Sequence, residues 1–179
     1  MTLPMPLPSP GRYKRAYLGL GSNMQDPQLQ IRLALAEIHT FPETQFIRVS
    51  SLYQTQAVGP ISQDDFINAV VAIDTHLSPD DLLARCLALE QKQGRIRARR
   101  WAPRIIDCDV LWYDDTPFHS ANLTLPHPEM CQRLFVLVPL AELAPTLQLS
   151  NGHAIAEQIA ALEQLGGQKI TRMATQSVA

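Results

Sequence analysis

Hydrophobic and polar positions follow two different periods along the chain, and each period predicts one kind of element. Apolar runs rich in β-branched and aromatic residues predict strands at 16–20, 45–53, 66–75 and 104–113. Apolar residues at helical spacing predict helices at 26–41, 78–93 and 155–165. The helix predicted at 26–41 carries a broad apolar stripe that combines two rows, Leu29, Leu33 and Ala36 with Ile31, Leu35 and Ile38.

Local signals mark the ends of these helices. Asp26-Pro27 supplies an N-cap and a proline at the first helical position, and Ser78-Pro79-Asp80-Asp81 combines a cap with an acidic first turn. Gly94 suits the end of the second helix. Glu90 falls at the edge of the inward face of this helix, so it is either a boundary residue in solvent or an acid held near the loop that follows.

The first six elements follow the order βαββαβ, with extra elements after them. This order is the split βαβ pattern, so the predicted fold class is α+β, a ferredoxin-like core sheet with helices packed on it. Beyond the core we expect an extended segment at 123–128 and two short helical pieces within 129–143, separated by Pro139. We expect a single domain at 15–165 between a disordered tail, 1–14, and a flexible tail, 166–179.

Two acidic residues interrupt the last predicted strand of the core. Residues i and i+2 of a strand point to the same face, so Asp107 and Asp109 project together while Ile106, Cys108 and Val110 point into a core. Two carboxylates on one face repel each other unless a cation lies between them. Mg²⁺ is a hard ion that prefers oxygen ligands and phosphates, so the pair predicts a magnesium site. The alternative is an edge strand with a solvated face.

An arginine-rich loop precedes this strand. Six of the 15 Lys and Arg residues fall between Lys92 and Arg104, among them Arg95, Arg97, Arg99 and Arg100. Arginine forks bind phosphate oxygens in a bidentate manner, so this cluster beside two carboxylates predicts a polyphosphate site. A solvated charged loop and an RNA-binding patch are alternatives, but the aromatic platform and basic flanks expected of an RNA-binding surface are missing.

Further candidates lie elsewhere in the chain. Asn68 shares a strand face with Phe66, so a flat heterocycle could stack on the ring and bond to the amide. Gly19-x-Gly21 follows a strand but lacks the third glycine of a dinucleotide fingerprint, which favours close backbone packing and a turn. His127, between two prolines, is either a turn residue or a phosphate or nucleotide contact.

Composition narrows the class of protein. The 179 residues carry a net charge of −2, which argues against nucleic acid as a partner through bulk charge. The three cysteines form no CxxC pair, so we expect free thiols and a reducing, cytoplasmic location. No apolar run approaches ~20 residues, and no secretory signal is recognisable, so no membrane partner is expected.

Together these segments resemble the 6-hydroxymethyl-7,8-dihydropterin pyrophosphokinase family of folate biosynthesis over about residues 16–146. The segment with the highest specificity is Arg100-Trp101-x-Pro103-Arg104-x-x-Asp107-x-Asp109. The other matching segments are Gly19-Leu20-Gly21-Ser22-Asn23, Gly59-Pro60, 65–70, Glu90, Gly94-Arg95-x-Arg97, Leu125-Pro126-His127-Pro128, Arg133-x-Phe135 and 139–145.

The resemblance implies an ATP-dependent diphosphotransferase, which moves pyrophosphate from ATP to the hydroxymethyl group of the pterin and releases AMP. It implies two Mg²⁺ ions on Asp107 and Asp109, with Arg95 and Arg104 steadying the phosphoryl oxygens. It places the pterin against Phe66 and Phe135, with its polar edge at Thr55, Val58 and Asn68. The implied ATP contacts are Glu90, Arg97, Arg100, Trp101, Val110, Thr124, His127 and Arg133.

The sequence also departs from the family pattern around the arginine loop, which is about one residue shorter. Ala102 stands where glycine is usual, and Asn122 where some members carry an arginine. These departures motivate an alternative, a pterin- or nucleotide-binding paralogue with reduced catalysis. Family analogy further implies a monomer and a closing lid.

Overall fold

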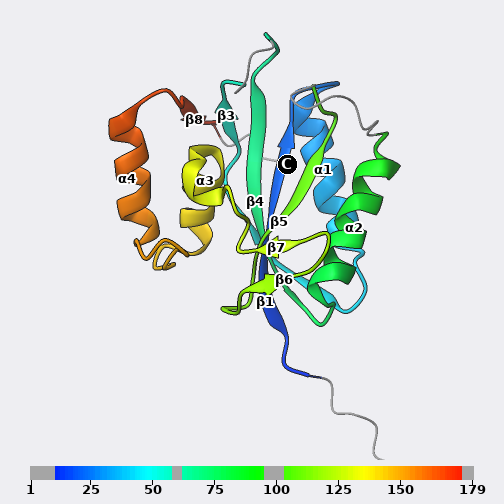
Figure 1. Ribbon diagram of the computed structural model, residues 1–179. Coiled ribbons are helices and arrows are strands. Elements are labelled where there is room, and N and C mark those ends of the chain that lie inside the picture. The colour runs from blue at the N-terminus through cyan, green and yellow to red at the C-terminus, as the bar shows by residue number, and fades with distance from the viewer. Residues whose placement is uncertain (1–10, 58–61, 95–102, 175–179) are drawn as a thin grey trace, which may run out of the picture.

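The computed structural model describes residues 11–57, 62–94 and 103–174 and shows a twisted sheet with helices on both faces (Figure 1). The strands of the main sheet are β1 Lys14–Ser22, β2 Thr44–Val49, β3 Tyr53–Thr55, β4 Phe66–Thr75, β5 Asp107–Tyr113 and β8 Ile170–Arg172. A separate two-stranded sheet contains β6 Phe118–His119 and β7 Thr124–Leu125. The helices are α1 Pro27–Ile38, α2 Pro79–Lys92, the 3₁₀ helix η1 Met130–Gln132, α3 Leu134–Leu143 and α4 Ile155–Leu165.

Strands β1 and β4 form the centre of the main sheet. The strand order is β5-β1-β4-β3-β8. β2 also pairs with β4, along the same edge as β3 but with a later part of β4. Every pairing is antiparallel, with Gly19 of β1 opposite Val70 of β4 on one side and Asp109 of β5 on the other. The glycines of β1 therefore lie directly beside the acidic residues of β5.

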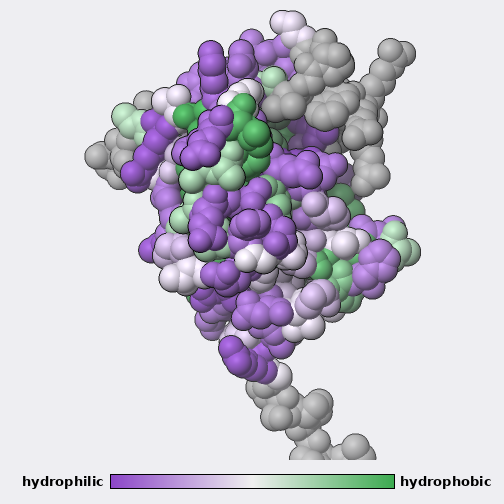
Figure 2. Space-filling model, turned by 60° about the vertical axis from the view of Figure 1, so that its left-hand side comes forward, coloured by the Kyte–Doolittle hydropathy of each residue, from purple (hydrophilic) through white to green (hydrophobic). Residues whose placement is uncertain are grey.

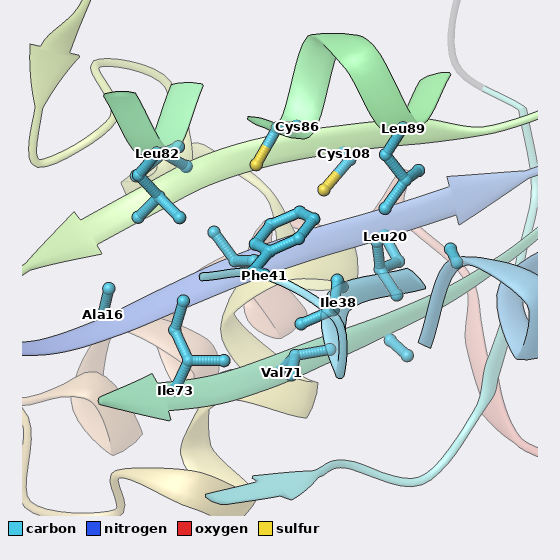
Figure 3. Packing of buried hydrophobic residues seen from close by; sticks show 14 of the residues in the cluster. Ala16, Leu20, Ile38, Phe41, Val71, Ile73, Leu82, Cys86, Leu89 and Cys108 are labelled. Carbon is cyan, nitrogen blue, oxygen red and sulfur yellow. The ribbon is translucent and has the colours of Figure 1, made fainter. Parts of the chain in front are cut away.

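Each face of the sheet has its own core. Alternate residues of β1 point to opposite faces, so Ala16, Leu18 and Leu20 pack with α1 and α2, whereas Tyr17 packs with α3 and α4. Figure 3 shows part of the first core, in which the sulfurs of Cys86 on α2 and Cys108 on β5 lie near each other. Both of these cysteines are buried free thiols.

The structure corrects the predicted stripe of α1. Ile31, Ala34 and Ile38 are buried, but Leu29 and Leu33 are 41 % and 48 % exposed. The apolar face that packs on the sheet is thus narrower than the sequence stripe, because only about one third of a helix circumference meets a single flat layer.

The strand predicted at 45–53 is in fact two strands that both pair with β4. β2 ends at Val49 and β3 begins at Tyr53. Between them Ser50 donates its backbone N–H to Val70 O and accepts from Val70 N through its hydroxyl, both at 2.9 Å. A serine that satisfies both backbone groups of its neighbour interrupts the strand without leaving a buried polar group unpaired.

The prediction that Pro139 separates two helical pieces is wrong. Pro139 lies inside α3, and the break falls earlier, at Arg133, whose φ of −121° and ψ of 103° are extended. A proline in a helix costs one hydrogen bond, but Leu137 and Leu140 are fully buried in the core that joins α3 to the sheet. Burial of this face outweighs the lost bond.

The ends of the chain also differ from expectation. Lys14, expected in the N-terminal tail, is the first residue of β1. Within the expected C-terminal tail, Ile170–Arg172 form β8, which pairs with β3. Among the described residues, no helix is both long enough and apolar enough to cross a bilayer.

Candidate functional site

A cavity of about 460 Å³ opens between the sheet and the layer that contains α3. Strands β1, β3, β4 and β5 contribute to one side, and the start of α3 with the segment after α4 contributes to the other. Figure 2 turns the side of the molecule that bears α4 forward and shows a mostly hydrophilic surface with hydrophobic residues gathered in its upper part. Eight of the residues proposed from the sequence line the cavity, namely Thr55, Phe66, Asn68, Arg104, Asp107, Asp109, Arg133 and Phe135.

A second hollow of about 510 Å³ lies at the start of β1. It is bordered by Arg15, Asp74 and Trp112, among others, and by none of the site residues predicted from the sequence. Arg15 and Asp74 already pair with each other there, at 2.5 and 3.1 Å. The cavity between the sheet and α3 is therefore the candidate active site.

Two glycines of β1 form the floor of this cavity. A Cβ atom on Gly19 would lie 3.2 Å from a methyl group of Leu111, and one on Gly21 would lie 3.0 Å from Asn68 Oδ1. Both distances are tighter than nine in ten real Cβ contacts, so a side chain at position 21 would require the Asn68 amide to shift by a few tenths of an ångström. The interpretation of Gly19-x-Gly21 as close packing is confirmed.

The predicted carboxylate pair lies at one end of the cavity. Asp107 and Asp109 both line it, as the strand period predicted, while Cys108 and Val110 between and after them are buried in the core. Arg104 donates from Nη1 to Asp107 Oδ2. Burial lowers the pKa of Arg104, but the charge and hydrogen bond of Asp107, together with the charges of Asp109 and Glu90, outweigh burial and leave the pKa above its ordinary value.

Asp109 is open to solvent within the cavity yet crowded by protein atoms. This crowding raises the pKa of Asp109 above its ordinary value, and the charge of Asp107 raises it further. The nearby cations of His127, Arg133 and Arg104 offset only part of this effect. The carboxylate pair is thus a place where additional positive charge would be stabilised.

Sequence reasoning missed a role for Asn23, the residue that follows β1. Asn23 is buried, accepts from Arg104 N at 2.8 Å through Oδ1, and donates its backbone N–H to Arg104 O at 3.1 Å. Its Nδ2 donates to Gln63 Oε1 at 2.9 Å and to Asp64 O at 3.1 Å. Asn23 therefore connects the arginine end of the cavity to the loop before β4. The Gly-Ser-Asn sequence after a strand was the available signal.

On the other side of β1 from the carboxylates, β4 contributes an amide and an aromatic ring to the cavity. Asn68 Nδ2 donates to the hydroxyl of Thr55 at 2.7 Å, and both residues are buried. Phe66 lies on the same strand face, and Phe135 reaches the cavity from α3. The guanidinium carbon of Arg133 lies 5.6 Å from the centre of the Phe135 ring, which is within the range of a cation–π contact.

Two basic side chains approach Asp109 from the α3 side. The pKa of His127 lies below its ordinary value. Burial lowers it most, Arg133 lowers it further, and the charge of Asp109 offsets part of the change. Burial also lowers the pKa of Arg133, and Asp109 opposes that change. Arg133 pairs with Glu129, and His127 Nδ1 accepts from Glu129 N at 3.2 Å. His127 is thus near the carboxylates without lining the cavity.

Besides His127, three predicted ATP contacts among the described residues lie outside the cavity lining. Glu90 is only 3 % exposed, which excludes a boundary position in solvent, and its Oε1 accepts from Cys108 N at 2.8 Å. The side chain of Val110 is buried in the core beneath α1 and α2. Thr124 is exposed on β7 and its hydroxyl lies 2.9 Å from His119 Nδ1. Their predicted contact with ATP stays a prediction, as does that of His127.

Five predicted site residues lie outside the described residues. These are Val58 on the pterin side and Arg95, Arg97, Arg100 and Trp101 in the arginine loop. The cavity described here is therefore built without them.

The carboxylate pair fits a magnesium ion. In 11–57, 62–94 and 103–174, no group of three or more His, Cys, Asp and Glu side chains could hold a metal. Mg²⁺ does not need such a group, because it is usually held by one or two carboxylates, with waters and substrate phosphates completing its shell. Asp107 and Asp109 supply that number of carboxylates beside an open cavity.

Comparisons with known proteins agree on one family. The family model described as 7,8-dihydro-6-hydroxymethylpterin-pyrophosphokinase (HPPK) matches residues 17–145. The chain is 44 % identical over 148 residues to 2-amino-4-hydroxy-6-hydroxymethyldihydropteridine pyrophosphokinase of Pseudomonas aeruginosa, covering 83 % of this chain and 91 % of the relative. It is 44 % identical over 156 residues to the protein of the same name from Methylorubrum extorquens, covering 87 % and 98 % of the two chains.

Solved structures show the same fold at low sequence identity. An HPPK-DHPS in complex with substrates superposes with a TM-score of 0.69 at 13 % identity, over 87 % of this chain and 44 % of that one. Wild-type Plasmodium falciparum HPPK-DHPS gives a TM-score of 0.65 at 14 % identity, over 84 % and 44 %. The chain thus spans less than half the length of these two solved chains. By its match to the family model and to the bacterial relatives, the chain belongs to the 7,8-dihydro-6-hydroxymethylpterin-pyrophosphokinase family.

Proposed function

We propose that the protein transfers pyrophosphate from ATP to 6-hydroxymethyl-7,8-dihydropterin, giving AMP and the pterin diphosphate, a step of folate biosynthesis. One observation carries the proposal beyond family membership. In a single cavity, the carboxylates of Asp107 and Asp109 on β5, with Arg104, lie on one side of β1, and Asn68 and Phe66 on β4 lie on the other side, while Phe135 joins the lining from α3. A diphosphate-binding end next to a heterocycle-binding end is what this reaction requires.

The pterin would occupy the aromatic end. Its flat ring would stack between Phe66 and Phe135, and its polar edge would bond to Asn68 and to the backbone near Thr55 and Val58. The hydrogen bond from Asn68 Nδ2 to Thr55 fixes the amide and leaves Oδ1 facing Gly21 and the cavity floor. A fixed amide distinguishes one edge of a heterocycle from another, because an unpaired buried polar group is costly.

The triphosphate would occupy the charged end. Asp107 and Asp109 would hold Mg²⁺, two ions by family resemblance, which neutralises phosphate charge when bound. Arg104 would steady the phosphoryl oxygens together with Arg95. The remaining ATP contacts would come from Glu90, Arg97, Arg100, Trp101, Val110, Thr124, His127 and Arg133.

The chain's own contribution to catalysis would be positioning and charge neutralisation. Holding two reactants in line converts a bimolecular reaction into an effectively unimolecular one. Arg104 is suited to this role because Asn23 anchors its backbone on both sides and Asp107 orients its guanidinium.

We also propose that the core is ferredoxin-like. The order β5-β1-β4 with β2 and β3 beyond β4, all antiparallel, supports this arrangement, and so do the helices between β1 and β2 and between β4 and β5. The cytoplasmic location and the monomeric state stay predictions.

The deciding experiment measures AMP. The protein is incubated with Mg²⁺, ATP and 6-hydroxymethyl-7,8-dihydropterin, and AMP and ADP are separated chromatographically. Pterin-dependent AMP release supports the proposal. ADP as the product would contradict the proposal. No turnover would also contradict it and would favour the alternative, a binding paralogue with reduced catalysis. The retained carboxylate pair argues against that alternative.

Asp109→Ala tests the assigned roles within the cavity. Removing one of two metal-binding carboxylates should lower kcat by about 10²-fold or more, because charge neutralisation of the phosphates is lost. Pterin binding measured by fluorescence should change less than twofold. Asp115→Ala, an exposed carboxylate outside the cavity, is the matched control and should leave both quantities unchanged. Near-normal turnover of the Asp109→Ala variant would rule out the metal assignment.

A further inference from the structure

The segment that follows α4 lies beyond the residues matched by the family model, 17–145, yet it borders the cavity. Gly167 and Gln168 both line it, and β8 begins two residues later. In Figure 1, β8 lies beside β3 at the edge of the sheet, so the chain passes from α4 to the strand next to β3.

The course of this segment is fixed at both ends. Gly166 and Gly167 have φ values of +71° and +88°, a region that side chains disfavour, and they turn the chain back toward the sheet. β8 then pairs with β3 in the register Ile170 opposite Thr55, and Met173 N donates to Leu52 O at 2.9 Å. The segment is thus attached to the strand that carries Thr55.

Gln168 attaches the same segment to the opposite wall. Its Oε1 accepts from the backbone N–H of Leu134 at 2.9 Å, and its Nε2 donates to Gln132 O at 2.9 Å. Leu134 is the first residue of α3, and the N-cap position, Arg133, makes no side-chain capping bond. Gln168 therefore supplies, from a distant part of the sequence, the cap that the helix lacks locally.

The two bonds of Gln168 enclose Arg133 and hold the turn that precedes Phe135. The side chains of Arg133 and Phe135 both reach the cavity from the start of α3. The far end of α3 is held separately, because Glu142 accepts from Ser51 N at 3.1 Å and from the Tyr53 hydroxyl. The cavity end of α3 thus depends on Gln168 in a way that the far end does not.

We propose that Gln168 is a positioning residue for the heterocycle, acting through the start of α3 to set the distance of Phe135 from Phe66 and Asn68. This inference rests on the proposed function of the cavity as a pterin site. The positioning role follows from its two bonds, because its oxygen and its nitrogen each hold a backbone group at the start of α3. The segment 166–173 is then part of the binding site although the family match ends before it.

The test uses the full chain with Gln168→Ala and Gln168→Glu, and with Gln164→Ala as the matched control on the exposed side of α4. The Kd for fluorescent 6-hydroxymethylpterin is measured without nucleotide, and KM is measured for ATP and for the dihydropterin. Loss of two hydrogen bonds in Gln168→Ala should raise the pterin Kd and KM roughly tenfold while KM for ATP changes less than twofold. Gln168→Glu keeps the acceptor for Leu134 N at a helix N-terminus, so it should recover part of the affinity.

Circular dichroism establishes that each variant is folded before binding is measured. A pterin Kd of Gln168→Ala equal to that of the unchanged protein would overturn the inference, and so would an equal rise of KM for pterin and ATP. Lack of AMP release by the unchanged protein contradicts the proposed function instead. The binding measurement does not depend on turnover, so the two failures are distinguishable.

Discussion

At the scale of single residues, the contact between Gly21 and Asn68 shows how a residue without a side chain shapes the site. The carboxamide oxygen of Asn68 occupies the space that a Cβ atom at position 21 would need, 3.0 Å away. The amide in turn is oriented by its bond to Thr55 at 2.7 Å. Specific recognition of a heterocycle edge would thus depend on Gly21, the second-to-last residue of β1.

Gly21→Ala should therefore weaken pterin binding without unfolding the protein. The new methyl group forces the Asn68 amide away from its position, and we expect the pterin Kd to rise roughly tenfold, the value of one misplaced hydrogen bond to a polar ligand edge. Fluorescence titration with 6-hydroxymethylpterin measures this. Gly11→Ala, where nothing lies within 4 Å of the added Cβ, is the matched control. Unaltered affinity in Gly21→Ala would mean that Asn68 does not contact the pterin.

At the scale of elements, a carboxylate on α3 holds β3 in place. Glu142 accepts from the backbone N–H and hydroxyl of Ser51 at 3.1 and 3.2 Å, and from the hydroxyl of Tyr53. Burial alone would raise the pKa of Glu142, but these hydrogen bonds outweigh it and leave the pKa below its ordinary value. Burial, followed by the bond to Glu142, raises the pKa of Tyr53 to about 12. The ionised form of Glu142 thus favours the folded state.

Glu142→Gln should lower the free energy of unfolding at pH 7 by about 1 kcal/mol, the value of a charge-assisted hydrogen bond discounted for partial exposure. Because the folded pKa is depressed, this contribution is present above the ordinary pKa of 4.5 and is lost as pH falls through the folded pKa. The difference between the two proteins should therefore shrink below about pH 4. Urea unfolding at several pH values measures it. Glu163→Gln, an exposed carboxylate on α4, should show no difference, and a gap that persists unchanged at pH 3 would contradict the argument.

At the scale of the whole molecule, the cavity lies between the sheet and the layer that contains α3. One core joins the sheet to α1 and α2, and the other joins it to α3 and α4. The carboxylates belong to β5 and the second aromatic ring belongs to α3, so a bound pterin with its phosphates would contact both the sheet and the α3 layer. Ligand binding should stabilise the molecule as a unit.

We expect 6-hydroxymethylpterin at 100 times its Kd to stabilise the fold by about 2.7 kcal/mol. For a chain of this length that corresponds to a rise in Tm of roughly 5–10 °C. Differential scanning fluorimetry measures the shift. Phe66→Ala removes one stacking surface, so at the same pterin concentration the shift should be largely lost, whereas Phe66→Leu should keep more of it. A full shift in Phe66→Ala would refute the stacking assignment.

Short spacing in the sequence predicted part of the cavity lining, but not the glutamines that support it. Spacing alone placed Asp107 and Asp109 on one face of a strand and Asn68 beside Phe66, and the structure has all four in the cavity lining. No spacing rule could indicate Gln168 or Gln63, because their partners lie 34 and 40 residues away. Gln168 bonds to backbone groups and Gln63 bonds to the Asn23 amide, and these partners become neighbours only in the folded chain.

The sequence by itself determined the order of the core elements, the shared face of the carboxylate pair and the family, because these depend on the short periods of strands and helices and on charged positions at fixed spacing. Only the tertiary structure decided that Pro139 stays inside α3, that the strand after α1 divides into β2 and β3, and that Ile170–Arg172 join the sheet. Each of those outcomes depends on burial or hydrogen bonds between segments far apart in the chain, and such long-range interactions override local preference wherever their combined free energy is larger.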